Sequence, residues 1–403
     1  MNALPLAGLR VLDFSKILAG PLCAQYLGDM GADVIKVEAQ DLGDDTRYMP
    51  PFREAGADKA GALFLSVNRN KRSLAVKIGS DAGRVIVYRL AKEADISVSS
   101  FGPGVAKKLG IDADALRACN PRLICCDISG FGSVGPMRQG KGYDVILQAF
   151  TGMLSITGEP GGVPVRSPFS PVDQATGLHA LAGILAALYR RERTGLGGTV
   201  EASLFDSATG FLGSFLQNFW ERGTEPEKAG SGHESLCPYQ AFETADKPLI
   251  LGVANDALWK KFCGVAGLDP ICDDPRYRSN ADRVRNRAET NAMVSATLAA
   301  RPRDAWLAAL EQAGIPCSPV HTLGELSKHP HARESGMTFD YVHPTLGALQ
   351  GVAQPLRLDG GRAAMRCPPP LHGEHSHEIL REFGFAEGEI ADLMASGIVT
   401  SPK

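Results

Sequence analysis

The chain has 403 residues, of which 44% are hydrophobic and 22% charged, and its formal net charge is −3 at pH 7. These values are typical of an ordinary soluble globular protein, and the length predicts two or three domains of about 150 residues each. The nearly neutral net charge gives no reason to expect nucleic acid or an anionic membrane as a partner.

The cysteines and the N-terminus predict a cytoplasmic protein. Nine cysteines are scattered along the chain without a CxxC pair, and Cys125 and Cys126 are adjacent in an apolar run, which is typical of reduced, buried thiols. No basic segment precedes an apolar one at the start, so we expect no signal peptide. The longest apolar run, 179–189, is shorter than the roughly 20 residues that cross a bilayer.

The first 130 residues alternate between strand and helix patterns. A strand over 8–14, a helix from Ala19 to about Met30 with Pro21 in its first turn, and a strand over 33–38 form a strand–helix–strand unit. This unit predicts a parallel sheet with right-handed crossovers. Residues 39–61 are expected to form a loop. Further strands are predicted at 63–68, 73–78, 95–99 and 122–128, and helices at 81–93, 103–109 and 112–119.

The middle of the chain is predicted to be mostly helical, and a charged, glycine-bearing stretch at 221–234 indicates a domain boundary. Helices are predicted at 143–156, 173–191 and 206–220, with a loop over 157–171 and a short strand from Val200. The next domain is predicted to contain strands at 239–242, 249–253 and 315–321 and helices at 257–266, 283–300 and 303–313. Strands at 337–342 and 351–356 and a helix at 378–383 are expected to rejoin the first domain.

Asp173 stands between a proline-broken segment and the apolar run that ends at Tyr189. Taken alone, it is best interpreted as a helix N-cap that accepts hydrogen bonds from unpaired amides. The alternative is a carboxylate held at a helix N-terminus, where it stays ionised and can attack an acyl carbon. The local sequence leaves both interpretations open.

Several familiar motifs are absent or incomplete. Residues 130–135 match GxGxxG after a strand, but loop residues follow them instead of the helix that a dinucleotide site requires. The chain contains neither Gly-x-Ser-x-Gly nor a P-loop. His372, His375 and His377 fit no zinc spacing, so no metal site is predicted.

Cations are grouped in the first 110 residues, near the predicted strand ends and a helix start. In an open α/β sheet, ligands bind beyond the carboxyl ends of the strands, and grouped cations there suit a ligand that carries phosphates. The aromatic Phe101 lies in a flexible segment beside them. The group comprises Lys36, Asn70-Lys71-Arg72-Ser73 and Lys107-Lys108.

Together these motifs resemble the class III CoA-transferases, a family that includes formyl-CoA:oxalate CoA-transferase and the α-methylacyl-CoA racemases. The resemblance spans nearly the whole chain, and its motifs occur in the right order. They are Gly8–Phe14, Ala19–Pro21, Gly31–Glu38, Asn70–Ser73, Phe101–Gly104, Gly142–Asp144, Asp173 with Thr176–Gly177, Gly183–Ala187, Arg193–Gly195 and Leu371–His375.

The resemblance implies an α/β fold in which two protomers interlock as rings, and hence a homodimer. Each protomer would have a large Rossmann-like domain built from both chain ends, residues 1–220 and 331–403. A smaller α/β domain would span 238–330, with a linker and glycine loop at 221–237.

The resemblance also implies a reaction. An aspartate at the position of Asp173 attacks the acyl-CoA thioester, a mixed anhydride forms, and coenzyme A attacks it to give an aspartyl-CoA thioester. The acceptor carboxylate then attacks, and the steps run in reverse. Backbone amides of Gly230, Ser231 and Gly232 are expected to stabilise the oxyanions. No tightly bound cofactor is implied, since coenzyme A and acyl-CoA are the substrates.

Other positions match the family's ligand contacts. By this resemblance, the backbone of Ile17, Leu18 and Ala19 contacts coenzyme A, and Lys141 and Tyr143 line the active site. The pocket for the adenosine and the phosphates is expected to contain Lys36, Arg72, Phe101, Gly102 and Lys108.

Residue 143 separates two branches of the family. The racemases carry His before Asp where this chain has Tyr143-Asp144, because racemisation needs an acid/base on each face of the α-carbon. Tyrosine, with an unperturbed pKa of about 10, is a poor substitute at neutral pH. We therefore favour a transferase, with an acyl-CoA racemase or isomerase as the alternative.

The donor is predicted to be succinyl-CoA or a related dicarboxyl-CoA, and the acceptor a small carboxylic acid. Formyl-CoA transferases carry several consecutive glycines where this chain has only Gly230-Ser231-Gly232, which disfavours oxalate. The run Pro164–Arg166 resembles transferases of the succinyl-CoA:glutarate or mesaconate type. Arg166 is either a bidentate clamp for a distal carboxylate or a loop arginine in a surface ion pair.

Overall fold

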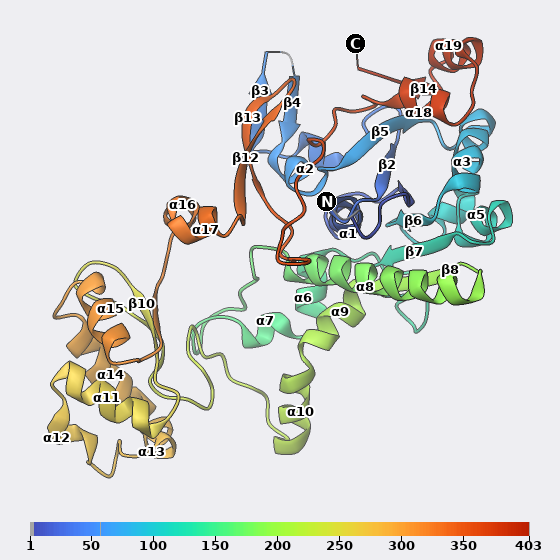
Figure 1. Cartoon of the computed structure of the whole chain (residues 1–403). Coiled ribbons are helices and arrows are strands. Elements are labelled where there is room, and N and C mark those ends of the chain that lie inside the picture. Colours follow the sequence, from blue (N-terminus) through green and yellow to red (C-terminus); the bar gives the residue numbers. More distant parts are fainter. Residues whose placement is uncertain (1–3, 57, 403) are drawn as a thin grey trace. The chain divides into compact units, whose positions relative to one another are not determined.

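The computed structural model describes residues 4–56 and 58–402, which form two compact units (Figure 1). Unit 1 comprises Met1–Met153, Ser167–Asn218 and Pro330–Lys403, and unit 2 comprises Leu154–Arg166 and Phe219–His329. The predicted domain boundaries followed residues 220 and 330, whereas the units divide after 218 and 329. Unit 2 also includes a segment, 154–166, that the prediction assigned to the large domain.

A seven-stranded sheet of order β14-β5-β2-β1-β6-β7-β8 forms the centre of unit 1. Six strands are parallel, and β14 (Val399–Thr400) pairs antiparallel to β5 at one edge. The parallel strands are β1 (Arg10–Asp13), β2 (Asp33–Glu38), β5 (Lys71–Val76), β6 (Ile96–Ser99), β7 (Ile124–Ser129) and β8 (Gly198–Ser203). Counted along the chain, these six have the Rossmann order 3-2-1-4-5-6, whose winding reverses between β1 and β6.

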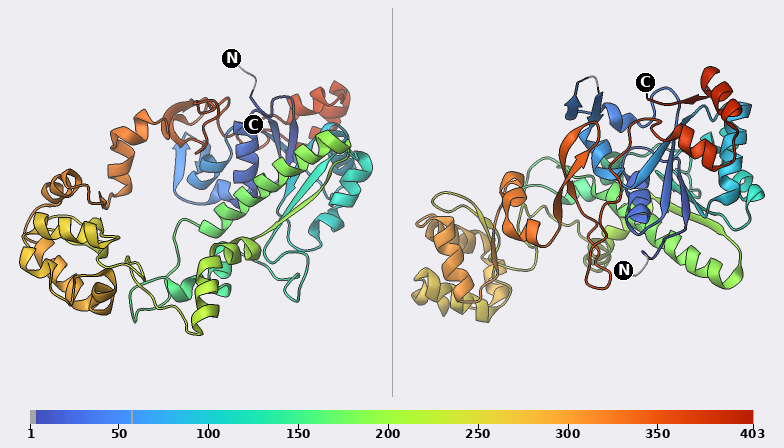
Figure 2. Two further views of the ribbon diagram at one scale, coloured as in Figure 1. Left: turned by 60° about the horizontal axis from the view of Figure 1, so that its bottom comes forward. Right: turned by 45° about the horizontal axis from the view of Figure 1, so that its top comes forward.

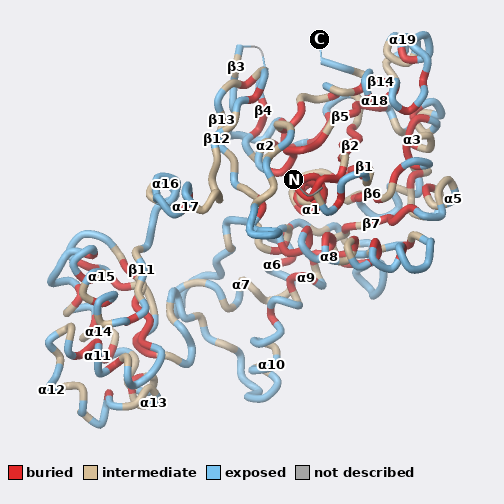
Figure 3. Tube along the Cα trace, in the orientation of Figure 1, coloured by how far each residue is buried: buried red, intermediate tan, exposed pale blue. Residues whose placement is uncertain are grey.

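Helices cover both faces of this sheet because successive strand residues point to opposite sides (Figure 2). Val11 belongs to the core shared with α1 (Ala19–Asp29), α8 (Pro171–Thr194) and α9 (Leu204–Phe211). Its neighbour Leu12 belongs to the opposite core, which holds the second set of helices. These are α3 (Asp81–Glu93), α5 (Ala113–Cys119), α18 (Ser376–Glu382) and α19 (Glu387–Ala395). The central strands are accordingly buried along most of their length (Figure 3).

Shorter elements complete the rest of unit 1 and its junctions. They are η1 (Asp45–Tyr48), β3 (Phe52–Ala55), β4 (Asp58–Gly61), α2 (Ala62–Val67), α4 (Val105–Leu109), α6 (Asp144–Phe150), α7 (Met153–Ile156), α10 (Gly213–Arg222), α17 (Pro330–Glu334), β12 (Thr338–His343) and β13 (Gly347–Val352). Strands β3 and β4 form one antiparallel pair, and β12 and β13 form another.

Unit 2 has its own apolar core, which includes Trp259, Phe262 and Trp306. Its antiparallel sheet has the order β11-β10-β9, with β9 (Tyr239–Phe242), β10 (Leu249–Gly252) and β11 (Cys317–Pro319). Its helices are α11 (Asp256–Ala266), α12 (Asp269–Cys272), α13 (Asn280–Arg285), α14 (Arg287–Leu298), α15 (Arg303–Gln312) and α16 (Leu323–Lys328).

Some local predictions were wrong. Of residues 63–68, predicted as a strand, all but the last lie in helix α2, which buries Phe64 and Val67 at helical spacing. The predicted loop at 39–61 contains η1 and the hairpin of β3 and β4. The prediction also missed α19 and β14. Both are short elements, and both are stabilised by contacts with the rest of unit 1.

Candidate active site

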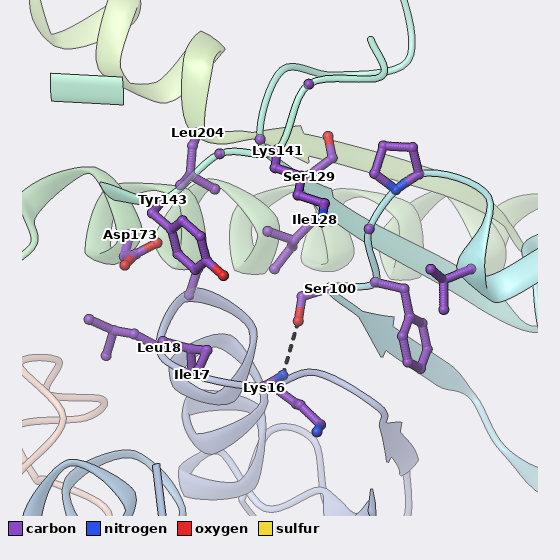
Figure 4. Close-up of a pocket in the computed structure, with 18 of the residues that line it drawn as sticks. Lys16, Ile17, Leu18, Ser100, Ile128, Ser129, Lys141, Tyr143, Asp173 and Leu204 are labelled. Atoms are coloured by element: carbon purple, nitrogen blue, oxygen red, sulfur yellow. Dashed lines mark hydrogen bonds between the residues drawn. The ribbon is translucent and has the colours of Figure 1, made fainter. Parts of the chain in front are cut away.

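A cavity of about 440 Å³ lies in unit 1 at the carboxyl edge of the sheet, where the winding reverses between β1 and β6 (Figure 4). This is the position at which open α/β sheets bind ligands. The loops after β1, β6 and β7 and the start of α8 form its walls. Its lining includes Lys16, Ile17, Leu18, Ala19, Asp45, Ser100, Phe101, Gly102, Ile128, Ser129, Gly130, Lys141, Gly142, Tyr143, Asp173 and Leu204.

Asp173 is the third residue of α8, and its carboxylate lines the cavity. The helix start is capped by another aspartate, because Asp144 Oδ2 accepts hydrogen bonds from the backbone N–H of Val172 at 2.9 Å and of Asp173 at 3.1 Å. Ser170, which precedes the helix, makes no side-chain cap. The N-cap interpretation of Asp173 is therefore wrong: among the described residues, its carboxylate has no hydrogen-bond partner.

Burial, reinforced by the nearby Asp144 carboxylate, raises the pKa of Asp173 from 3.8 to about 7. Desolvation disfavours the charged form, and a like charge adds to that effect. Near neutral pH, this side chain thus exists as a mixture of acid and carboxylate. A carboxylate with few hydrogen bonds and little water around it is a better nucleophile than a fully solvated one.

We expect Asp144→Asn to move the rise of activity with pH toward lower pH. The substitution removes a negative charge that raises the pKa of Asp173, so the reactive carboxylate forms at lower pH. The asparagine side-chain oxygen can still accept from the helix amides. The profile of kcat/KM against pH measures the shift, and Asp127→Asn, a carboxyl outside this cavity, is the control. An Asp144→Asn profile that overlays the wild-type profile would contradict this account.

The loop after β1 and the start of α8 approach each other closely at Gly177. A Cβ atom at Gly177 would lie 2.6 Å from the carbonyl oxygen of Ala19, so only glycine fits here without a shift. In the same loop, Ile17 has a φ of 72°, a backbone conformation that β-branched residues rarely adopt. The close approach sets the distance between this strained loop and Asp173.

A second close contact, between two glycines, places Lys141 and Tyr143 at the cavity. A Cβ at Gly130 would lie 2.6 Å from the backbone of Gly142, and the reverse is equally close. This contact holds the segment before α6 against the end of β7. Gly130 is the first glycine of the GxGxxG match, and no helix begins between β7 and Asp144, so it serves backbone packing.

The structure brings together most of the predicted ligand-binding residues of unit 1. Those that line the cavity are Ile17, Leu18, Ala19, Phe101, Gly102, Lys141, Tyr143 and Asp173. Lys36, Arg72 and Lys108 are not among the lining residues. Lys108 is exposed on the short helix α4.

Lys36 and Arg72 are already neutralised by carboxylates, which corrects their predicted role as phosphate ligands. Lys36 is fully buried, and its Nζ lies 3.0 Å from Asp44 Oδ2. The Arg72 guanidinium pairs with three carboxylates on the opposite edge of β2 and on α18. These are Asp33, Glu378 and Glu382, at 2.5, 2.9 and 2.8 Å.

Lys16 was not among the predicted site residues, yet with Lys141 it supplies the cations of the cavity wall. The backbone N–H of Lys16 donates to Ser100 Oγ at 3.0 Å (Figure 4). The Nζ of Lys16 lies 3.9 Å from Asp45 Oδ1. Lys16 is the first cation beyond the carboxyl end of β1, and that position was the signal that could have identified it.

The predicted oxyanion loop and Arg166 belong to unit 2. The N–H of Gly230 donates to Gly158 O at 2.9 Å, and the N–H of Gly232 donates to Ala229 O at 2.7 Å. Because these two amides are occupied, Ser231 carries the only one of the three predicted donors that makes no hydrogen bond in the described part of the chain. Arg166 is exposed and, within the same residues, forms no ion pair, so the surface-pair interpretation is not supported.

The three C-terminal histidines make separate local contacts. His372 Nε2 lies 2.9 Å from Ala39 O, His375 Nδ1 accepts from the N–H of Ser73 at 3.3 Å, and His377 Nε2 lies 2.9 Å from Glu387. In residues 4–56 and 58–402, no three His, Cys, Asp or Glu side chains are grouped as metal ligands. No helix in the same ranges is long and apolar enough to cross a membrane.

The sheet order and the cavity at its reversal point define a doubly wound α/β protein with an acidic group facing its ligand site. The chain belongs to CoA-transferase family III, whose family model matches residues 6–376, and it is an enzyme of this class.

Relatives and a solved structure agree with this assignment. The chain is 37% identical to succinyl-CoA:glutarate CoA-transferase of Mus musculus over 98% of this chain and 90% of that protein. It is 35% identical to acetyl-CoA:oxalate CoA-transferase of Acetobacter aceti over 96% of this chain and 97% of that protein. The crystal structure of a CAIB/BAIF family protein from Brucella suis matches with a TM-score of 0.87 and 34% identity, covering 95% of this chain and 100% of that one.

Proposed function

We propose that this protein transfers coenzyme A from a dicarboxyl-CoA, with succinyl-CoA as the donor, to a second small dicarboxylic acid through covalent intermediates on Asp173. One observation carries the proposal: a half-buried carboxylate without a hydrogen-bond partner in the described chain faces the ligand cavity of a family III CoA-transferase. A group placed in this way is poised to act as a nucleophile.

The reaction takes four displacements at acyl carbons. Asp173 attacks the thioester carbonyl, the C–S bond breaks, and a mixed anhydride and CoA thiolate result. The thiolate attacks the Asp173 carbonyl, which releases the donor acid and leaves an aspartyl-CoA thioester. The acceptor carboxylate then displaces the thiolate to form a second anhydride. The thiolate finally attacks the acceptor carbonyl, and the Asp173 carboxylate is restored.

The cavity chemistry fits an acyl-CoA. Lys16 and Lys141 offer charge to phosphates, whereas Ile17, Leu18 and Leu204 offer apolar surface to a pantetheine arm. We assign the phosphate contacts to the two lysines in place of Lys36 and Arg72. Lys108, exposed on α4, is kept as an outer phosphate contact.

The names of the relatives support dicarboxylic acids as substrates, since glutarate and oxalate are both dicarboxylates. Arg166, exposed and without an ion pair in the described residues, is proposed to bind the distal carboxylate of the substrate. The N–H of Ser231 is proposed to stabilise the oxyanions. The proposal includes a homodimer, and sedimentation equilibrium should give twice the chain mass of 42.8 kDa.

Trapping the covalent intermediate tests this function. We expect hydroxylamine, added with succinyl-CoA, to convert Asp173 to a hydroxamate that peptide mass spectrometry locates. An acceptor screen with glutarate, mesaconate, oxalate and acetate should give transfer to at least one dicarboxylate and little to acetate. Loss of the donor's α-deuterium in the absence of any acceptor, without a trapped aspartyl group, would instead identify the racemase alternative.

A further inference from the structure

Two lysines of the central sheet are almost completely enclosed by protein. Lys36 on β2 and Lys71 on β5 have relative exposures of 0% and 1%. Neither lines the cavity. Burying two ammonium groups is costly even when they are paired, and apolar side chains of similar size often serve stability as well. Their presence therefore calls for a role other than stability.

Each lysine holds a backbone carbonyl at one end of the strained loop after β1. Lys36 Nζ donates to Ser15 O at 2.9 Å, and Lys71 Nζ donates to Pro21 O at 2.8 Å. Between these two points lie four residues that line the cavity, Lys16, Ile17, Leu18 and Ala19. The two ammonium groups thus fix both ends of the ligand-binding segment.

Two buried aspartates connect these ammonium groups. Asp13, at the end of β1, lies 2.8 Å from Lys71 Nζ and 4.0 Å from Lys36 Nζ. Asp44 lies 3.0 Å from Lys36 Nζ, and its other oxygen accepts from the N–H of Ile17 at 3.4 Å. Both carboxylates are 0% exposed. We call Asp13, Lys36, Asp44 and Lys71 the buried charge cluster.

The cluster acts on a residue whose backbone is strained. A φ of 72° is sterically unfavourable at a β-branched residue and persists only where the surroundings enforce it. Here the hydrogen bond from Ile17 to Asp44 and the anchored carbonyl of Ser15 enforce it. Asp44 is itself fixed, since it also accepts from the N–H of Thr46 at 3.0 Å.

We propose that the buried charge cluster holds Ile17–Ala19 in the conformation that receives the acyl-CoA, and that Lys36 is a positioning residue which never touches the ligand. This inference rests on the proposed function, since it names how the same site is kept ready. The competing account is that Lys36 contacts the phosphates directly. The two accounts predict different losses of activity when Lys36 is replaced. A phosphate contact would affect only a donor that carries phosphates, whereas a positioning role would affect any thioester donor.

The double variant Lys36→Met with Asp44→Asn tests this, because it removes one charge of each sign and leaves no new unpaired ion. Its kcat/KM is measured with succinyl-CoA and with succinyl-pantetheine, which carries no phosphates. We expect a loss of about 10–100-fold with both thioesters, since a displacement of about 1 Å at a site has effects of this size. A loss confined to succinyl-CoA would show a phosphate contact and overturn the inference, as would no loss with either.

A second variant reports on the strain directly and is independent of overall stability. Glycine adopts a φ of 72° readily, so Ile17→Gly should need less support from the cluster. We expect the double variant to lose at least threefold less activity in the Ile17→Gly background than in the wild-type background. An equal loss in both backgrounds would overturn the inference. If the wild-type protein transfers from neither thioester, it is the proposed function that fails.

Discussion

Asp173→Asn is expected to lower kcat for CoA transfer by at least about 10⁴-fold, because the amide cannot form the anhydride on which every later step depends. The steady-state rate of succinyl-CoA consumption with a dicarboxylate acceptor measures the loss. The matched control is Asp206→Asn. Asp206 is also the third residue of its helix, α9, and does not line the cavity, so this variant should keep its activity.

The same substitution should stabilise the folded protein above neutral pH. The folded pKa of Asp173, about 7, is raised above its ordinary value of 3.8, so its stabilising contribution is full below 3.8 and is lost as the pH rises through 7. Asparagine carries no charge to bury. Because the side chain is partly exposed, we expect a gain of only about 1–2 kcal/mol at pH 8 and little difference at pH 4.

Together, the two measurements separate a lost nucleophile from a damaged fold. An inactive variant that unfolds at higher temperature than the wild type at pH 8 would locate the chemistry at residue 173. Retained transfer in Asp173→Asn, at more than about a hundredth of the wild-type rate, would refute the covalent mechanism.

Gly177→Ala should have the next largest effect. The new Cβ would lie 2.6 Å from Ala19 O, and a backbone carbonyl on a helix start cannot move away cheaply. We expect a stability loss of about 1–3 kcal/mol from overpacking and a fall in kcat/KM of about 10²-fold, because Asp173 and the loop at Ile17 shift apart. Thermal unfolding and initial rates provide the two measurements.

Gly210→Ala is the control for this prediction. Gly210 is also a helical glycine, but a Cβ there meets nothing within 4 Å. It should raise stability by about 0.5–1 kcal/mol through better helix propensity and leave the rates unchanged. Equal behaviour of the two variants would show that the contact between Gly177 and Ala19 does not position the site.

The sequence was most informative where local patterns decide the structure. The periodic patterns of β2 and α3 predicted both elements at the same bounds as the structure. The parallel α/β sheet followed from these alternating patterns. At the site, the resemblance assigned Ile17, Tyr143 and Asp173 to one region, and all three line the same cavity.

Ion pairs and hydrogen bonds between residues far apart in the chain could not be predicted from the sequence. Arg72 reads as a free cation after a strand, yet its partners Glu378 and Glu382 lie some 300 residues later in the chain. Lys36 likewise reads as an unpaired cation in the sequence, and only the folded sheet brings it to Asp13 and Asp44. The capping role of Asp144 could not be predicted for the same reason, since it depends on the packing of α6 beside α8.

The cap that Asp144 places on α8 has an evolutionary consequence. The first turn of the helix is capped by a residue 29 positions upstream, so the side chain at 173 is not needed to stabilise that turn. Evolution can therefore replace that side chain with one that carries a hydroxyl or a thiol without destabilising the first turn of the helix. The scaffold is thereby open to new reactivity at the very point where it meets its substrate.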